Sequence, residues 1–258
     1  MRVFSFLSRR TFFSSLVIAA FALINCSFAQ SADESSEITA IKQLLLTTQP
    51  QMEIEAVSKS PAAGLYEVTI NGGQTIYVTS DARFFIPGDL YEAQSDGLVN
   101  LGEGKRNLIR KEKIDALNEA DMIVYAPAGE RKATLTVFTD VDCPYCRKLH
   151  AEVEALNEMG IAVRYLAFPR TGLNTETHFK MISTWCADDR KAMMTSAKRG
   201  GEVPKADCEN PIASQYQLGR EVGVTGTPAL VFEDGTMLPG YVPAATLGSY
   251  LLDKPGQP

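Results

Sequence analysis

The sequence has no excess of positive charge, the feature on which nucleic-acid binding usually depends. It contains 25 Lys and Arg residues against 31 Asp and Glu residues. Arg2, Arg9 and Arg10 lie in an N-terminal segment that we expect to be removed, which leaves 22 basic residues against the same 31 acidic ones. The mature chain would carry a net charge of about −9, so we expect no nucleic acid among its partners.

Long apolar segments are also scarce. One runs from Leu16 to Ile24, after the three arginines, and Ser27-Phe28-Ala29 then offers small residues for cleavage. This pattern predicts a signal peptide over residues 1–29. No other segment approaches the roughly 20 apolar residues of a membrane span, so we expect a soluble, exported protein.

The processing and export route has alternatives. Lipoprotein processing would use Cys26, but Asn25 before it is not the small residue that such processing favours. The segment Ser8-Arg9-Arg10-Thr11-Phe12-Phe13 also resembles a twin-arginine signal, which carries folded proteins. Since disulfides form after export, we favour the general secretory route and leave the twin-arginine route open.

Cysteine is rare, and its count suits an oxidising compartment. Of five cysteines, four remain once Cys26 is removed. Cys186 and Cys208 would close a loop of 23 residues, counting both ends. In the chain-entropy model such a bridge contributes about 3 kcal/mol, so we interpret this pair as a structural disulfide. The alternative is a second redox-active pair.

Histidine is scarcer still, with two in the chain, and this limits metal binding. Cys143 and Cys146 form a CxxC motif, which is also half of a zinc site. Cys186 and Cys208 lie far away and form no second CxxC, so we favour redox chemistry and expect neither a metal nor another cofactor. We expect His150, seven residues after Cys143, to be a packed or surface residue.

The residues after Cys143 have helical signals. Pro144 suits the first helical position, where its missing N–H costs nothing. The apolar positions Cys146, Leu149, Val153 and Leu156 follow a 3.6-residue period, and Gly160 marks the end. Cys143 would then face solvent at the helix N-terminus, where unpaired N–H groups and the dipole lower a thiol pKa, while Cys146 points inward. This predicts Cys143 as the nucleophile and Cys146 as the resolving thiol.

Several separate blocks of sequence match one known family. They are Phe138-Thr139-Asp140, Cys143-Pro144-Tyr145-Cys146, Lys148-Leu149-His150, Val163 to Arg170, Trp185-Cys186-Ala187 and Gly226-Thr227-Pro228-Ala229. From Phe138 to Asp253 the sequence resembles the DsbC/DsbG family of bacterial periplasmic protein-disulfide isomerases, its DsbC branch more than its DsbG branch. The Pro-Tyr dipeptide is a departure, because the DsbC branch commonly carries Gly-Tyr, and it leaves the reduction potential and substrate preference open.

The resemblance implies roles for residues outside the CxxC. It places a cis-proline at Pro228, facing the cysteines, so that the backbone of Thr227 can pair with an extended substrate. Pro144 and Tyr145 would contact the substrate as well. Gly88 matches the glycine at the family's dimer interface, although an ordinary turn glycine is the alternative.

We expect four parts in the chain. After the signal peptide come an α+β dimerisation domain over residues 30–91, a linker helix within 92–121 and a thioredoxin fold over 122–258. A helical insertion over about 171–222 interrupts the thioredoxin fold. A unit of about 60 residues buries little surface, so we expect the first domain to pair with a second copy of itself.

Local patterns suggest the elements of these parts. In the first domain we expect an amphipathic helix around Ile38 to Leu45, a hairpin turning at Asn71-Gly72-Gly73, and a further strand at Phe84-Phe85-Ile86. In the linker, Gly97, Gly102 and Gly104 would loosen the chain before a solvated helix from Lys105 to Glu119.

In the catalytic domain we expect strands at Met122–Tyr125, Thr134–Thr139 and Ala162–Phe168, insert helices at Phe179–Ala187 and Ile212–Val222, a hairpin through Glu233-Asp234-Gly235 and a helix from Ala244 to Leu252.

Three functions compete. The first is disulfide isomerisation of misfolded exported proteins in the periplasm, which implies a DsbD-like membrane thiol reductant that keeps the site reduced. The second is net thiol oxidation or reduction of the DsbG type, and the third is a non-enzymatic holdase. A requirement for Cys143 separates the third from the others, and the redox state of the site separates the first two.

Overall fold

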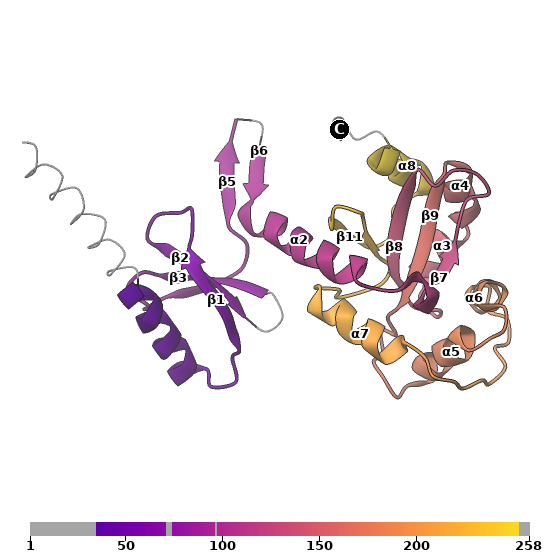
Figure 1. The fold of residues 1–258 in the computed structure, drawn as a ribbon, viewed down its shortest axis with the longest axis horizontal. Helices are drawn as coiled ribbons and strands as arrows, with labels where there is room; N and C mark the ends of the chain where they lie inside the picture. Colours follow the sequence, from indigo (N-terminus) through magenta and orange to yellow (C-terminus); the bar gives the residue numbers. More distant parts are fainter. Residues whose placement is uncertain (1–34, 71–73, 96, 253–258) are drawn as a thin grey trace, which may run out of the picture. The chain divides into compact units, whose positions relative to one another are not determined.

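The computed structural model describes residues 35–70, 74–95 and 97–252. The chain divides into two compact units, one ending at Gly88 and the other beginning at Asp89 (Figure 1). The expected signal peptide and the turn Asn71-Gly72-Gly73 lie outside the described residues. No helix in the described part of the chain is long and apolar enough to cross a membrane.

The first unit packs one helix on one antiparallel sheet. The helix is described over residues 35–48, and the strands pair in the order β1–β2–β3–β4. Their bounds are β1 Ile54–Lys59, β2 Leu65–Ile70, β3 Gln74–Thr79 and β4 Phe85–Pro87. Ile41 and Leu45 of the helix, one turn apart, are buried against Tyr66, Val68 and Ile76. Sequence patterns had no signal for β1, whose residues are half-buried or exposed.

One edge of this sheet is apolar and exposed. The edge strand β4 and the residue before it leave Phe84, Phe85 and Ile86 with 57%, 50% and 50% of their surface exposed. Gly88 follows at once with φ +153°, a conformation that disfavours any side chain. A Cβ there would meet nothing within 4 Å in this chain, so the backbone angle alone explains the glycine here.

The second unit begins with a hairpin and a helix. Strands β5 Tyr91–Gln94 and β6 Gly97–Asn100 pair antiparallel, and α2 spans Leu101–Asp115. The expectation that glycines loosen this segment is wrong: Gly97 begins β6, and Gly102 and Gly104 lie in α2. The helix begins early because the side chain of Asn100 accepts hydrogen bonds from two backbone N–H groups of its first turn.

The helix α2 is not wholly solvated, which corrects the second part of that expectation. Arg110 is only 4% exposed and donates to the carbonyls of Val222 at 3.2 Å and Gly235 at 2.5 Å. Gly235 allows this contact, since a Cβ on it would lie 1.9 Å from the carbonyl oxygen of Asn107. The C-terminal half of α2 is therefore part of the catalytic unit's structure.

The second unit is built around a five-stranded sheet in the order β11–β10–β8–β9–β7. The strands are β7 Ile123–Tyr125, β8 Ala133–Thr139, β9 Ile161–Ala167, β10 Ala229–Val231 and β11 Met237–Pro239. Strands β8 and β9 pair in parallel, and the helices α3 and α4 connect them. The other neighbours are antiparallel. This is the strand and crossover arrangement expected of a thioredoxin fold.

Alternation along the central strands separates two apolar layers. Leu135 and Val137 of β8 face a cluster that includes Leu149, Leu156 and Leu247. On the opposite face, a second cluster joins Phe138, Leu166 and Phe168 to Ile114 of α2 and to Val222 at the end of α7. Both faces are covered, so all seven residues of β8 are buried.

The helices of this unit are α3 Pro144–His150, α4 Val153–Glu158, α5 Glu176–Trp185, α6 Arg190–Lys198, α7 Ile212–Glu221 and α8 Ala244–Leu252. The single helix expected from Pro144 to Gly160 is broken at Ala151 and Glu152 into α3 and α4. Apolar periodicity missed the break because Leu149, Val153 and Leu156 still pack into one cluster. The helix α6 was not expected, and its Lys198 lies close to the site described below.

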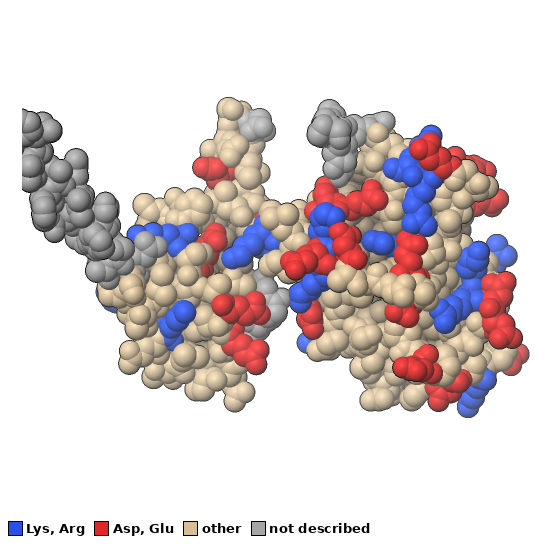
Figure 2. Space-filling view, viewed as in Figure 1, with Lys and Arg blue, Asp and Glu red and all other residues tan. Residues whose placement is uncertain are grey.

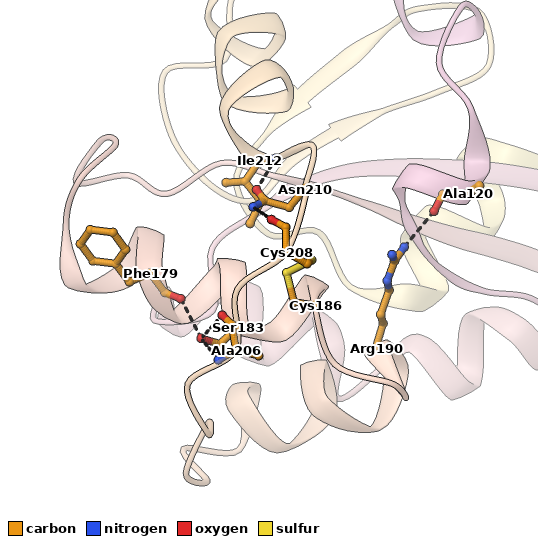
Figure 3. The surroundings of a disulfide bond; sticks show 9 residues. All are labelled: Ala120, Phe179, Ser183, Cys186, Arg190, Ala206, Cys208, Asn210 and Ile212. Carbon is orange, nitrogen blue, oxygen red and sulfur yellow. Dashed lines mark hydrogen bonds between the residues drawn. A yellow bond between two sulfur atoms is a disulfide. The ribbon is translucent and has the colours of Figure 1, made fainter.

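The two distant cysteines form a disulfide in the helical insert. Cys186 caps α5 and bonds Cys208, with the Cα atoms 5.7 Å apart (Figure 3). Beside it, Ser183 accepts from the backbone N–H of Ala206 at 3.2 Å, so the bridge and this hydrogen bond both tie the segment before α7 to α5. This pair takes no part in the geometry around the CxxC motif.

Candidate active site

The CxxC motif lies where the central strand β8 ends and α3 begins. Cys143 is the N-cap of α3, with Pro144 in the first turn. Its backbone N–H donates to the carbonyl of Asp140 at 3.2 Å, which closes the turn after the strand. The rigid end of a fully buried strand therefore fixes the position of the first sulfur.

The two thiols are both free and have opposite electrostatic environments. A hydrogen bond from the Cys146 thiol, together with the Cys146 backbone N–H and the charge of Arg170, lowers the pKa of Cys143 to about 5 against the opposing effect of burial. Burial, followed by the hydrogen bond to Cys143, raises the pKa of Cys146. Near neutral pH the first sulfur is a thiolate and the second a thiol.

Cys143 is less accessible than expected. The sequence predicts a solvent-facing sulfur, yet only 1% of the residue surface is exposed. The covering segment is the loop before β10, where the Thr227–Pro228 peptide is cis and Cys143 Sγ lies 3.2 Å from the carbonyl oxygen of Thr227. Pro228 is buried, whereas Tyr145 beside the cysteines is 62% exposed.

Two carboxylates that the sequence did not single out hold the turn in place. Asp140, 1% exposed, accepts from the backbone and side chain of Arg170 at 2.9 and 3.1 Å and from the backbone N–H of Asp142 at 2.7 Å. This fixes the guanidinium that helps to keep Cys143 ionised.

Asp142, next to Cys143, connects the turn to the helical insert. Lys180 of α5 donates to both carboxylate oxygens at 2.8 and 3.0 Å, and Thr177 donates to one of them at 3.0 Å. Burial opposes ionisation, but these hydrogen bonds hold the pKa of Asp142 below its usual value. Aspartate near a CxxC is not informative in sequence alone, because its partners lie 35 and 38 residues away.

The remaining candidate residues lie elsewhere. Gly88 belongs to the first unit, and Cys186 and Cys208 form the bridge in the insert. His150, half-buried, bonds the hydroxyls of Tyr165 and Thr195, each at 3.0 Å, and so is a packed histidine. Within residues 35–70, 74–95 and 97–252 no group of three or more His, Cys, Asp or Glu side chains is arranged to hold a metal ion.

Comparisons with known proteins assign the family. A model described as a thioredoxin-like domain matches residues 119–254, and one described as the N-terminal domain of disulfide bond isomerase proteins matches residues 28–103. A solved disulfide interchange protein from Neisseria gonorrhoeae is 32% identical, with a TM-score of 0.47, over 52% of this chain and 95% of that one.

Two curated relatives cover most of the chain. The thiol:disulfide interchange protein DsbC of Dickeya dadantii is 39% identical over 226 residues, which are 88% of this chain and 90% of the relative. The protein of the same name from Escherichia coli K12 is 35% identical over 243 residues, which are 94% and 95% of the two chains. This chain therefore belongs to the DsbC family of thiol:disulfide interchange proteins.

Proposed function

We propose that the protein is a thiol:disulfide interchange enzyme that isomerises wrong disulfides in exported proteins. One observation carries the proposal: the pKa of Cys143 is lowered to about 5, while that of its neighbour Cys146 is raised. Such a pair supplies one nucleophile that is ready at neutral pH and one thiol that reacts only after the first has done so.

The reaction balances as two thiol exchanges. The Cys143 thiolate attacks a substrate disulfide, a bond forms between the two sulfurs, and the other substrate sulfur leaves as a thiolate. In isomerisation a different substrate thiolate attacks the substrate sulfur of the mixed disulfide, so that a new substrate disulfide forms and Cys143 leaves as a thiolate. If Cys146 attacks first, the substrate leaves reduced and the enzyme keeps the disulfide.

The segments around the sulfur support binding of an extended polypeptide. The carbonyl oxygen of Thr227 lies 3.2 Å from the Cys143 sulfur, and a cis peptide joins Thr227 to the buried Pro228 just before β10. Pro144 and Tyr145, the two residues between the cysteines, are exposed. We assign these four residues to substrate binding, with the Thr227 backbone pairing to the substrate main chain.

The first unit supports assembly as a homodimer. Its edge strand β4 exposes Phe85 and Ile86 beside unpaired backbone groups, an arrangement that favours pairing with another strand. On the face drawn in Figure 2, charged side chains are sparse over this unit, whereas blue and red are interspersed over the second. We assign residues 30–91 to dimerisation, with Gly88 at the interface, because two joined catalytic domains hold one substrate at high effective concentration.

The remaining assignments complete the proposal. Residues 1–29 direct export to the periplasm, residues 92–121 link the units, and residues 122–258 form the catalytic domain. A membrane thiol reductant then keeps Cys143 and Cys146 reduced, because an isomerase with an oxidised site has no thiolate to begin exchange.

The test is recovery of activity from a scrambled multi-disulfide protein, measured together with molar mass by light scattering. Ile86→Lys should give monomers that lose most of this recovery but still exchange thiols with small disulfides. Leu46→Lys, on the helix of the same unit with a similar 49% exposure, is the matched control and should remain dimeric and active. Monomers that unscramble as well as the wild type would refute the dimeric isomerase.

Cys143→Ser separates the alternatives in the same assay. It should abolish recovery, because Cys146, the other free thiol in the described part of the chain, is buried and has a raised pKa. Recovery that survives this change would favour a holdase. Net oxidation of a reduced substrate without reshuffling, in the wild type, would favour an oxidase.

A further inference from the structure

A buried lysine lies directly beneath the CxxC turn. Lys198, the last residue of α6, is 3% exposed, and its Nζ donates to Thr139 Oγ1 at 2.6 Å and to the Asp140 carbonyl oxygen at 2.8 Å. The Asp140 carbonyl also accepts from the Cys143 backbone N–H. The amine and the nucleophile therefore share one acceptor at the end of β8.

The surroundings of Lys198 are unfavourable for a purely structural cation. Burying an ammonium group is costly, and buried lysines normally pair with a carboxylate. Here both hydrogen bonds that Nζ donates end on neutral oxygens. Nζ also lies 5.7 Å from the centroid of the Tyr165 ring. Two neutral acceptors stabilise a charged amine only partly, which suits a group that changes its protonation state.

We propose that the amine of Lys198 accepts the proton of the Cys146 thiol when Cys146 attacks the mixed disulfide on Cys143. In this step the Cys146 sulfur loses its proton to the neutral amine and forms a bond to the Cys143 sulfur. The bond between Cys143 and the substrate breaks, and the substrate sulfur leaves as a thiolate. The inference rests on the proposed function, since it concerns the resolving half of the same reaction.

Protonation equilibria support this role and link it to the mixed disulfide. Burial lowers the pKa of Lys198 to about 8, against the opposing effects of Cys146, Asp140 and Cys143. When Cys143 enters a mixed disulfide its charge disappears, so the pKa of Lys198 falls further. The hydrogen bond to the Cys143 thiolate, which helps to raise the pKa of Cys146, disappears at the same time. The first change increases the neutral fraction of the Lys198 amine, the form that can accept a proton, and the second lowers the pKa of the Cys146 thiol, which favours its deprotonation.

A route for the proton to solvent is present on the same side. Lys198 lines a cavity of about 310 Å³ together with His150, Thr195 and Arg199. His150 bonds Tyr165 at one ring nitrogen and Thr195 at the other, and burial lowers its pKa to about 4, so it is neutral near pH 7. We expect Lys198 to return its proton to water through this cavity after each turnover.

The titration of Lys198 depends on all groups that face it. These groups are Asp140 after β8, Cys143, Cys146, Arg147 and His150 of the CxxC turn and α3, Tyr165 of β9, and Arg199 at the end of α6. The positive charge of Arg147 lowers the pKa of Lys198, as burial does, whereas Cys146, Asp140 and Cys143 raise it. A pH profile in which only Lys198 has been changed is therefore needed to identify it.

The experiment uses the reduced mature protein and 5,5′-dithiobis(2-nitrobenzoate) in a stopped-flow spectrometer. The first nitrothiobenzoate released reports attack by Cys143, and the second reports resolution by Cys146. In the wild type the second rate should rise with pH and level off at or below about pH 8, because the pKa of Lys198, about 8 beside the Cys143 thiolate, is lower in the mixed disulfide. A second rate that keeps rising in proportion to hydroxide through pH 9.5 would overturn the proposal.

Two substitutions separate proton transfer from charge. Lys198→Met should leave the first release within about twofold and slow the second at least about a hundredfold at pH 7.5, the lower end of general acid–base effects. Lys198→Arg keeps the positive charge but cannot lose a proton, so its second release should also be slow. A second release as fast in Lys198→Arg as in the wild type would show that the positive charge alone is sufficient, and this would refute proton acceptance.

Controls keep the outcomes distinct. Lys148→Met removes a charge from the exposed side of α3 and should leave both releases unchanged. If Lys198→Met does not fold, Lys198→Arg and the wild-type profile decide the question. Loss of the first release in the wild type would contradict the proposed function itself, whereas an unchanged second release in folded Lys198→Met would contradict only the role of Lys198.

Discussion

The hydrogen bond between the two active-site thiols can be tested by removing its donor. Cys146→Ala deletes the thiol that is the first cause of the low Cys143 pKa of about 5. A hydrogen bond to a charged group contributes about 1.5–3 kcal/mol, and one pKa unit corresponds to about 1.36 kcal/mol, so the loss should raise the pKa by about 1–2 units. The variant should therefore titrate between about pH 6 and 7.

The assay follows the thiolate directly. Absorbance at 240 nm and the rate of alkylation by iodoacetamide both follow the ionised fraction of Cys143, which is small below its pKa and complete well above it. At pH 7 the wild type should be about 99% ionised and Cys146→Ala about half to nine-tenths ionised. Cys146→Ser is the matched control, because its hydroxyl retains a donor and should give a smaller rise.

One result would refute this explanation of the low Cys143 pKa. A Cys143 pKa in Cys146→Ala that stays near 5 would show that Arg170 and the backbone N–H, and not the neighbouring thiol, keep Cys143 ionised.

Mixed disulfides should also accumulate on Cys143 in the same variant, since no resolving thiol remains. Trapped substrate on Cys146 in a Cys143→Ser variant would reverse the assignment of nucleophile and resolving residue.

Two further predictions concern stability. Replacing Cys186 and Cys208 by Ala should cost about 3 kcal/mol and lower the melting temperature measured by calorimetry, with turnover per folded molecule nearly intact; a folded but inactive double variant would show that this pair is redox-active. Gly235→Ala should destabilise more than Gly240→Ala in urea unfolding. Both glycines have φ near +85°, where an alanine costs about 1 kcal/mol, but only at Gly235 would its Cβ also meet a backbone oxygen. Equal losses of stability in the two variants would mean that α2 moves away from the new Cβ at no cost in free energy.

The sequence determined the features that depend on neighbouring residues. The CxxC after an apolar strand, with proline in the first helical turn, is sufficient to predict a helix that begins at Pro144. The strands expected at Thr134–Thr139 and Ala162–Phe168 match β8 and β9 to within one residue at each end, and Ala244–Leu252 is helical as expected. The resemblance to known isomerases, carried by short blocks, added the thioredoxin fold and the cis peptide at Pro228, which no local propensity favours.

Tertiary structure decided what depends on residues far apart in the chain. Lys198 reads as an ordinary charged helix residue, and only folding brings it to the carbonyl of Asp140, 58 residues earlier. The low exposure of Cys143 has the same origin, because the covering Thr227 lies 84 residues away. The break between α3 and α4 was invisible because both pieces pack their apolar residues into one cluster. Local sequence fixes which backbone conformations are cheap, whereas burial and electrostatics at the cysteines are sums over distant neighbours, and these exist only once the chain has folded.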